Sequence, residues 1–167
     1  MMAYLDTNII VSYCFKDENY AKAAKIIEDL RRKRKQLYIS PLTLTELFAV
    51  ASTKGGEFKV PPHFKRFDRR TRVNLLVKYA LETLKPTVAP DEPLTEKFDE
   101  ASVFHIYKKA IELSPTLELP TLDLLHAAYA LHLASKGLAD TLVSLDDRVL
   151  ARKKRFENLG IRVYAPG

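Results

Sequence analysis

Four acidic residues lie far apart in the chain, each just after a predicted strand or near a predicted helix start: Asp6, Glu46, Asp123 and Asp146. Carboxylates that gather without water repel one another, which raises their pKa values or recruits a cation. All four offer hard oxygen ligands and no cysteine accompanies them, a donor set that suits Mg²⁺ or Mn²⁺ better than Zn²⁺. The sequence therefore predicts a divalent-metal site, provided that the fold brings the four acids together.

Each acid also has a purely structural interpretation. Asp6 and Asp146 could be helix N-caps, and Asp123 could stabilise the positive end of its helix. His126 follows Asp123 by three residues on the same helix face, but a histidine on a largely apolar helix is more often a hydrogen-bonded structural residue. We therefore expect the four acids, without His126, to bind the metal.

The elements that position these acids alternate between short strands and amphipathic helices. Strands are expected at residues 3–5, 37–39, 87–89, 141–145 and 161–164, and helices at 9–14, 17–35, 43–54, 73–84, 94–113, 122–136 and after Asp146. This alternation predicts an α/β fold, a three-layer α/β/α sandwich around a central, mostly parallel twisted sheet of about four or five strands. Asp6 and Asp146 each follow a strand, so both are expected at the carboxyl edge of the sheet, where open α/β folds bind ligands. Thr43 is expected to cap the third helix, with Glu46 completing a capping box.

Length and composition are those of an ordinary globular chain. Its 167 residues predict a single domain over 1–167. The single Cys14 excludes an intramolecular disulfide and suggests a reducing, cytoplasmic compartment. No stretch reaches the ~18 apolar residues of a spanning helix, and the N-terminus lacks the basic region of a signal peptide, so no membrane association is expected. The net charge of +6 favours a polyanionic partner.

A basic, irregular insertion is expected at residues 55–72. Phe64 and Phe67 lie there among the side chains that are candidates for RNA binding: Lys65, Arg66, Arg69, Arg70 and Arg72. Single-stranded nucleic acid is bound by such a combination, in which charges contact phosphates and rings stack on bases. The alternative, held equal, is that both phenylalanines are buried in the core beneath a charged loop.

Four short segments follow one another in an order that spreads over nearly the whole chain: Leu5-Asp6-Thr7-Asn8, Thr45-Glu46-Leu47, Leu122-Asp123-Leu124-Leu125-His126-Ala127-Ala128 and Ser144-Leu145-Asp146. By these segments the chain resembles the PIN-domain ribonucleases and, among them, the VapC-type toxins of toxin–antitoxin pairs. The resemblance implies a PIN-like sandwich whose acidic quartet, the four acids named above, binds Mg²⁺ or Mn²⁺.

The resemblance also implies roles within the site. Asp6 and Asp146 are the first choice as direct ligands, and the other two acids act through water or orient the attacking water. Asn8 and Ser144 support the site by hydrogen bonds, although the family more often has threonine at the position of Ser144. Asp147 has no fixed counterpart in the family, and we expect it to substitute for Asp146 or to assist it.

The implied activity is that of a metal-dependent endoribonuclease, which hydrolyses an RNA phosphodiester and leaves a 3′-hydroxyl and a 5′-phosphate. The implied partners are RNA, a protein antitoxin and a second copy of the chain in a homodimer. Two alternatives stay open: a PIN nuclease of RNA processing or decay without an antitoxin, and a non-catalytic RNA-binding PIN scaffold. A phosphoaspartate enzyme is disfavoured, because Asn8 stands where haloacid-dehalogenase-like enzymes need a second aspartate.

Overall fold

The computed structural model describes residues 2–164. At its centre lies a five-stranded sheet in the order β3-β2-β1-β6-β7, in which every neighbouring pair is parallel. The strands are β1 (Met2–Leu5), β2 (Gln36–Ile39), β3 (Thr87–Val88), β6 (Thr141–Val143) and β7 (Arg162–Tyr164). The predicted α/β fold with a parallel central sheet is therefore confirmed.

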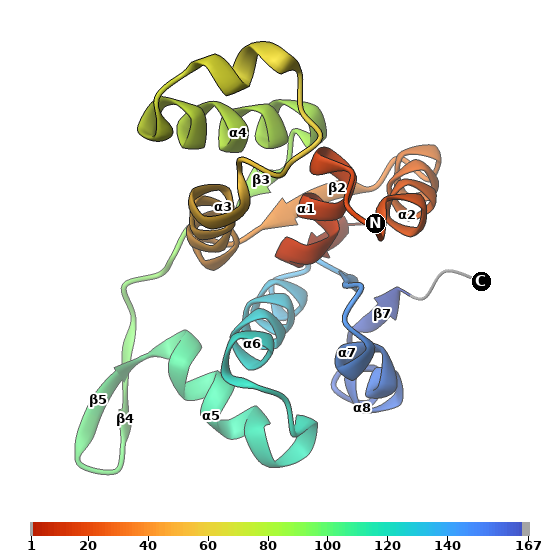
Figure 1. Ribbon diagram of the computed structural model, residues 1–167. Helices are drawn as coiled ribbons and strands as arrows, with labels where there is room; N and C mark the ends of the chain where they lie inside the picture. Colours follow the sequence, from red (N-terminus) through yellow and green to blue (C-terminus); the bar gives the residue numbers. More distant parts are fainter. Residues whose placement is uncertain (1, 165–167) are drawn as a thin grey trace.

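Two hydrophobic cores form because successive side chains of a strand point to opposite faces of the sheet. Tyr4 and Leu142 belong to one core, whereas Leu5 and Val143 belong to the other. The second core is covered by α1 (Thr7–Phe15), α2 (Tyr20–Arg32), α3 (Pro41–Lys54) and α4 (Arg69–Leu84). The first core is covered by α5 (His105–Leu117), α6 (Thr121–Ser135), α7 (Asp147–Ala151) and α8 (Lys153–Asn158). Figure 1 shows these two helical layers above and below the sheet.

The start of α3 differs from the prediction. Ser40, not Thr43, is the N-cap, and its Oγ accepts a hydrogen bond from the Thr43 backbone N–H at 3.3 Å. Pro41 occupies the first helical position, where its missing N–H leaves no bond unmade. Thr43 therefore completes the capping box that was expected of Glu46, and the Glu46 carboxylate is left for other contacts.

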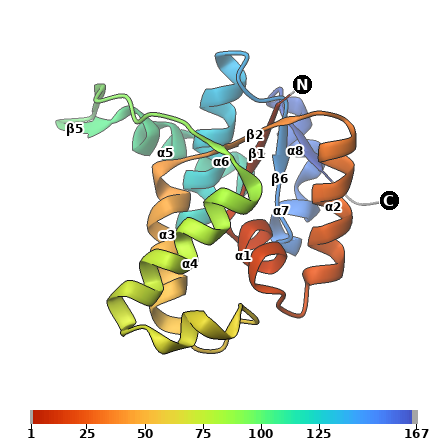
Figure 2. The same cartoon turned by 90° about the horizontal axis from the view of Figure 1, so that it is seen from above.

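A helix was expected over 94–113, but this prediction is wrong for the first half of the range. Residues Thr95–Phe98 (β4) and Ala101–Phe104 (β5) form an antiparallel hairpin, and α5 begins only at His105. The two-residue turn places Asp99 at φ 53°, in the left-handed region that aspartate tolerates better than most residues. Phe98 and Phe104 on this hairpin are consequently exposed. Figure 2 shows the hairpin projecting from the body of the molecule.

The basic segment is more regular than expected at its C-terminal end. A 3-10 helix covers Pro62–Arg66, and α4 begins at Arg69, with the Asp68 side chain accepting from the Thr71 N–H at 3.1 Å. Phe64 is half-buried and packs edge-on against Tyr79, whereas Phe67 is exposed. The alternative in which both rings are buried in the core is therefore wrong for Phe67, and RNA contact by Phe67 stays a prediction. Among residues 2–164, no helix is both long and apolar enough to cross a membrane.

Candidate metal centre

Asp6 and Ser144 meet because they follow two neighbouring strands at the same edge of the sheet. Leu5 is in register with Val143, and the Asp6 N–H extends the ladder by donating to Val143 O at 2.9 Å. Asp6 Oδ2 accepts hydrogen bonds from Ser144 Oγ at 2.7 Å and from Asn8 Nδ2 at 2.9 Å. These two bonds hold the Asp6 carboxylate by its Oδ2 atom, so the Oδ1 atom is left for other contacts.

Asn8 connects the start of α1 to the loop after β6. Its Nδ2 also lies 3.0 Å from Ser144 Oγ, and its Oδ1 accepts from the Leu145 N–H at 3.0 Å. Ser144 Oγ in turn accepts from the Asp146 N–H at 3.0 Å. The two side chains that were predicted to support the site therefore orient both Asp6 and the backbone that carries Asp146.

The inner cluster consists of Asp6, Glu46 from α3 and His126 from α6. One ligand atom from each lies within 4.8 Å of the others. His126 Nε2 is 2.6 Å from Glu46 Oε2 and 3.5 Å from Asp6 Oδ1, and Thr7 Oγ1 also donates to Glu46. Burial raises the pKa of Glu46, but the hydrogen bonds from His126 and Thr7 outweigh it, so that the pKa lies below its usual value.

Tyr4 holds the other side of the His126 ring. Its hydroxyl lies 2.8 Å from His126 Nδ1 and 2.8 Å from Ser40 Oγ, in a fully buried position. Burial lowers the pKa of His126, but the hydrogen bond to Glu46 and the charge of Asp6 outweigh it and raise the pKa above its usual value. The tautomer of His126 decides which ring nitrogen donates to its partner, and either hydroxyl of the Tyr4–Ser40 pair can be the donor.

The outer pair consists of Asp123, near the start of α6, and Asp146, the N-cap of α7. Arg148 Nη2 lies 2.6 Å from Asp146 Oδ2 and 3.2 Å from Asp123 Oδ2. The second contact lacks hydrogen-bond geometry, so Asp123 Oδ2 is buried without a hydrogen bond from residues 2–164. Burial and the neighbouring Asp146 carboxylate raise the pKa of Asp123, whereas hydrogen bonds from Arg148 lower the pKa of Asp146.

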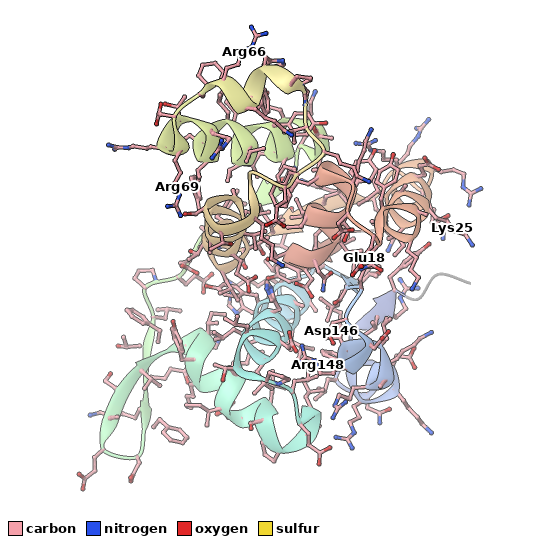
Figure 3. All side chains as sticks on the ribbon, viewed as in Figure 1. Glu18, Lys25, Arg66, Arg69, Asp146 and Arg148 are labelled. Carbon is pink, nitrogen blue, oxygen red and sulfur yellow. The ribbon has the colours of Figure 1, made fainter. Side chains whose placement is uncertain are left out.

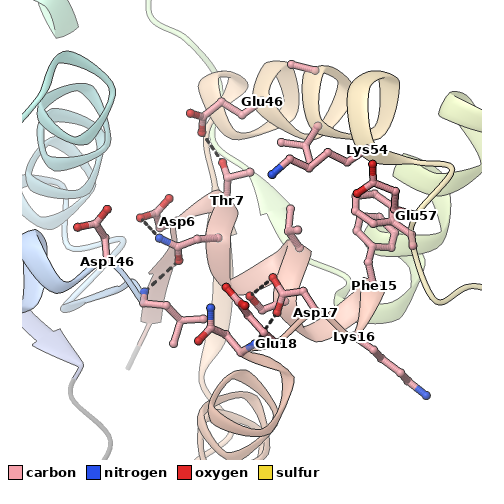
Figure 4. A pocket seen from close by; sticks show the side chains of 18 of the residues that line it. Asp6, Thr7, Phe15, Lys16, Asp17, Glu18, Glu46, Lys54, Glu57 and Asp146 are labelled. Atoms are coloured by element: carbon pink, nitrogen blue, oxygen red, sulfur yellow. Dashed lines mark hydrogen bonds between the residues drawn. The ribbon is translucent and has the colours of Figure 1, made fainter.

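One cleft of about 1030 Å³ contains both the inner cluster and the outer pair. Seven carboxylates and three lysines line it; the lysines are Lys16, Lys54 and Lys59. Figure 4 shows Lys54 extending from α3 with its ammonium directed toward Thr7, whereas Lys16 points away from the acids. The lining is thus rich in negative charge although the chain as a whole carries +6. A nucleic-acid phosphate would be repelled from the four acids unless a cation lay between them.

The structure therefore brings the four predicted acids and their supports Asn8 and Ser144 to one edge of the sheet, but other predicted residues lie elsewhere. Asp147 is exposed and does not line the cleft. The basic side chains of 65–72 do not line it either: Lys65, Arg66, Arg69, Arg70 and Arg72. Figure 3 shows Arg66 and Arg69 well away from Asp146, and Arg69 donates to the Ser52 backbone oxygen at 3.1 Å.

Four residues of the centre were not assigned to it from sequence, and one of them, Thr7, lies within the quoted segment Leu5-Asp6-Thr7-Asn8. His126 does have the expected hydrogen bonds, yet it lies inside the acidic group, and its position one helical turn after Asp123 was the available signal. Arg148 follows Asp146 by two residues, so its proximity to that carboxylate could also have been predicted from the sequence. Tyr4 gave no signal, because a tyrosine in an apolar strand is ordinarily a core residue.

Comparison with known proteins identifies a protein family that the chain matches. A family model described as PIN domain matches residues 3–155. Among solved structures, the chain is similar to a chain of VapBC2 from Rickettsia felis, crystallised bound to a DNA fragment from its promoter. The two are 19% identical with a TM-score of 0.55, over 99% of this chain and 100% of the other, so the likeness extends over the whole fold. No curated protein matches the sequence.

Proposed function

The chain belongs to the PIN domain family, whose members are nucleases, and from that premise we propose that it is a metal-dependent endoribonuclease acting as the toxin of a toxin–antitoxin pair. One observation carries the catalytic part of the proposal: Asp6, Glu46, Asp123 and Asp146, from four separate segments, line a single cleft. The presence of all four acids also argues against the alternative of a non-catalytic RNA-binding scaffold.

The donor set fits a divalent cation. The inner cluster offers two carboxylates and an imidazole whose ligand atoms lie within 4.8 Å of one another. Buried charged groups of this kind ordinarily are paired or coordinate metals. Carboxylate oxygens suit Mg²⁺ and Mn²⁺, and Mn²⁺ is the better match where an imidazole contributes.

The residues of the cleft have separable tasks in hydrolysis. When bound, a divalent ion supplies a positive charge that polarises the phosphate and makes a water molecule more acidic. The resemblance favours Asp6 and Asp146 as direct ligands, but the inner cluster favours Asp6 and Glu46, which would hold this ion. Asn8, Ser144 and Thr7 would keep these two carboxylates oriented. Orientation matters because reacting groups must meet in nearly the final geometry.

Two basic zones are proposed to contact RNA. Lys54 lies on the same face of α3 as Glu46, eight residues later, and its ammonium has neither a hydrogen bond nor an ion pair within residues 2–164. We assign it to a phosphate close to the scissile bond. The basic patch at 65–72 contacts RNA further away, so that replacing Arg66, Arg69 and Arg70 together should weaken binding and flatten its salt dependence.

The antitoxin, the homodimer and the cytoplasmic location are parts of the same proposal. The fold shared with VapBC2 supports a toxin that works with a protein partner. A small neighbouring reading frame whose product co-purifies with this chain would support the antitoxin. Its absence would favour a nuclease of RNA processing or decay, with the same chemistry.

The deciding experiment measures cleavage of defined single-stranded RNAs by wild type and Asp6→Asn, with Mn²⁺, with Mg²⁺ and with a chelator. The asparagine oxygen can still accept from Asn8 and Ser144, so the fold should be kept. We expect cleavage to fall at least about a hundredfold, because a ligand of the charge-stabilising cation is lost. Glu18→Gln is the matched control, since it removes a carboxylate that lines the same cleft outside the quartet.

Equal loss in both variants would mean that cleft charge in general, not the quartet, supports activity. Undiminished cleavage by pure Asp6→Asn, or cleavage that resists chelation, would refute the proposed chemistry. Metal-insensitive RNA binding without any cleavage by the wild type would favour the scaffold.

A further inference from the structure

The outer pair already has a cation of the protein's own. Arg148 binds Asp146 in a fork: Nε donates to Oδ1 at 3.0 Å and Nη2 to Oδ2 at 2.6 Å. The same Nη2 lies 3.2 Å from Asp123 Oδ2. A planar guanidinium suits such two-point contact with a carboxylate, and it remains charged at every pH at which a protein is folded.

The backbone helps to hold this arrangement. Asp146 is the N-cap of α7, and its Oδ1 also accepts the Arg148 N–H at 2.8 Å. The Arg148 backbone is therefore fixed beside the Asp146 carboxylate, from where its guanidinium reaches both Asp146 and Asp123. The guanidinium is half exposed to solvent, so no packing prevents its replacement by another side chain.

The inner cluster differs from the outer pair, because its basic group, the His126 imidazole, can lose a proton and ligate a metal, whereas the Arg148 guanidinium cannot. Within residues 2–164, the inner cluster is the one group in which three potential ligand atoms lie within 4.8 Å of one another. The outer pair offers two carboxylates with the guanidinium contacting both. The cleft thus contains one position suited to a metal ion and a second position where a side-chain cation already balances one of the two negative charges.

We propose that Arg148 takes the place of a second metal ion: the protein binds one divalent cation at the inner cluster, and the outer pair accepts another only when the guanidinium is removed. The inference rests on the proposed metal-dependent function and deepens it, since it sets the number of ions. It also assigns to Arg148 the task of keeping Asp123 and Asp146 compensated in the absence of substrate.

The test is Mn²⁺ binding to the metal-free full chain by isothermal titration calorimetry, with free Mn²⁺ counted by electron paramagnetic resonance. Wild type is compared with Arg148→Gln and Arg148→Met, which remove the charge but keep the backbone N–H that caps α7. Lys154→Gln is the control, because it removes one positive charge from exposed α8 at a side chain with no contact to the acids. Thermal melting followed by circular dichroism verifies that each variant is folded.

We expect one Mn²⁺ per chain in wild type and Lys154→Gln, and two in both Arg148 variants. One Mn²⁺ in the Arg148 variants, whatever its affinity, overturns the inference while leaving the proposed metal site intact, and so do two Mn²⁺ in wild type. Absence of Mn²⁺ binding in every protein would instead refute the proposed metal-dependent function itself.

Discussion

Replacing Tyr4 by phenylalanine removes a single oxygen that connects the sheet to the candidate metal centre. That hydroxyl lies 2.8 Å from both His126 Nδ1 and Ser40 Oγ and is fully buried. Ser40 keeps its contacts with Thr43, whereas His126 Nδ1 loses its hydrogen-bond partner. A buried polar group left without a partner costs about 1–3 kcal/mol. We therefore expect the free energy of unfolding to fall by about 2 kcal/mol.

A shift of about 2 kcal/mol corresponds to a Tm lower by about 4–8 °C for a chain of this length. Differential scanning calorimetry and urea unfolding measure it. Tyr38→Phe is the matched control, because Tyr38 stands directly opposite Tyr4 on β2 and is also buried. Its hydroxyl makes no hydrogen bond within residues 2–164, so the control should change stability by less than about 0.5 kcal/mol.

The same variant also tests the connection to function. If Tyr4 orients the His126 ring, Tyr4→Phe should weaken Mn²⁺ binding about tenfold, the lower end of the range for residues that orient metal ligands. Equal stability of Tyr4→Phe and Tyr38→Phe would refute the assigned hydrogen-bond chain. A destabilised Tyr4→Phe with unchanged Mn²⁺ affinity would restrict Tyr4 to a structural role.

Three further predictions concern other parts of the chain. Burial raises the pKa of Cys14 to about 12, so the native protein should not react with a thiol reagent at pH 8 but should show one thiol after unfolding; rapid native labelling would contradict this. Burial opposes the charge of Asp140, but a hydrogen bond from Lys35 at 2.7 Å outweighs it and holds the pKa below its usual value. A carboxyl group whose pKa is lower in the folded state than in the unfolded state, where it is about 4, stabilises the folded protein at pH values above 4. Asp140→Asn should therefore lower the free energy of unfolding by about 1–3 kcal/mol at pH 7. Urea unfolding should show this loss vanish as the pH falls through the folded pKa, and a loss independent of pH would contradict the assignment. Lys54→Gln should weaken RNA binding and reduce its salt slope by about 0.7, measured by fluorescence anisotropy, whereas the Lys154→Gln control should leave both unchanged.

The convergence of the four acids could be predicted because it depends on topology more than on side-chain detail. Asp6 follows a buried strand, and Asp146 lies a few residues after another. In an all-parallel sheet the carboxyl ends of all strands lie at one edge. The sequence did not show that β1 and β6 are neighbours, yet any close placement of the two strands would have brought these acids near each other.

The β4–β5 hairpin was missed because its sequence imitates a helix. Phe98, Ala101 and Ile106 are spaced in a way compatible with one apolar helix face, and the turn lacks the glycine that usually marks a two-residue hairpin. The chain instead turns at Asp99, with φ 53°. Nothing local decides between the two conformations, so packing against α5 must select the hairpin.

The contacts of His126 and Arg148 show a different limit. His126 meets Glu46 across 80 residues of sequence and Tyr4 across 122, so these partners depend on the register of elements that are distant in the chain. Residue type alone favoured a structural histidine, and the hydrogen bonds agree. The same bonds place the ring among the acids, however, so structural and functional roles coincide at this residue.

The charge of the cleft is opposite in sign to the net charge of the chain. A chain with a net charge of +6 attracts a polyanion from a distance, but the carboxylates that line the cleft repel phosphate at short range. The proposed function therefore assigns attraction and catalysis to different groups. Surface lysines and arginines would bring the nucleic acid to the protein, and a cation at the inner cluster would be needed before a phosphate could approach Asp6. Arg148 reduces the same repulsion at the outer pair. Binding of RNA should thus depend mainly on salt, and cleavage mainly on the metal.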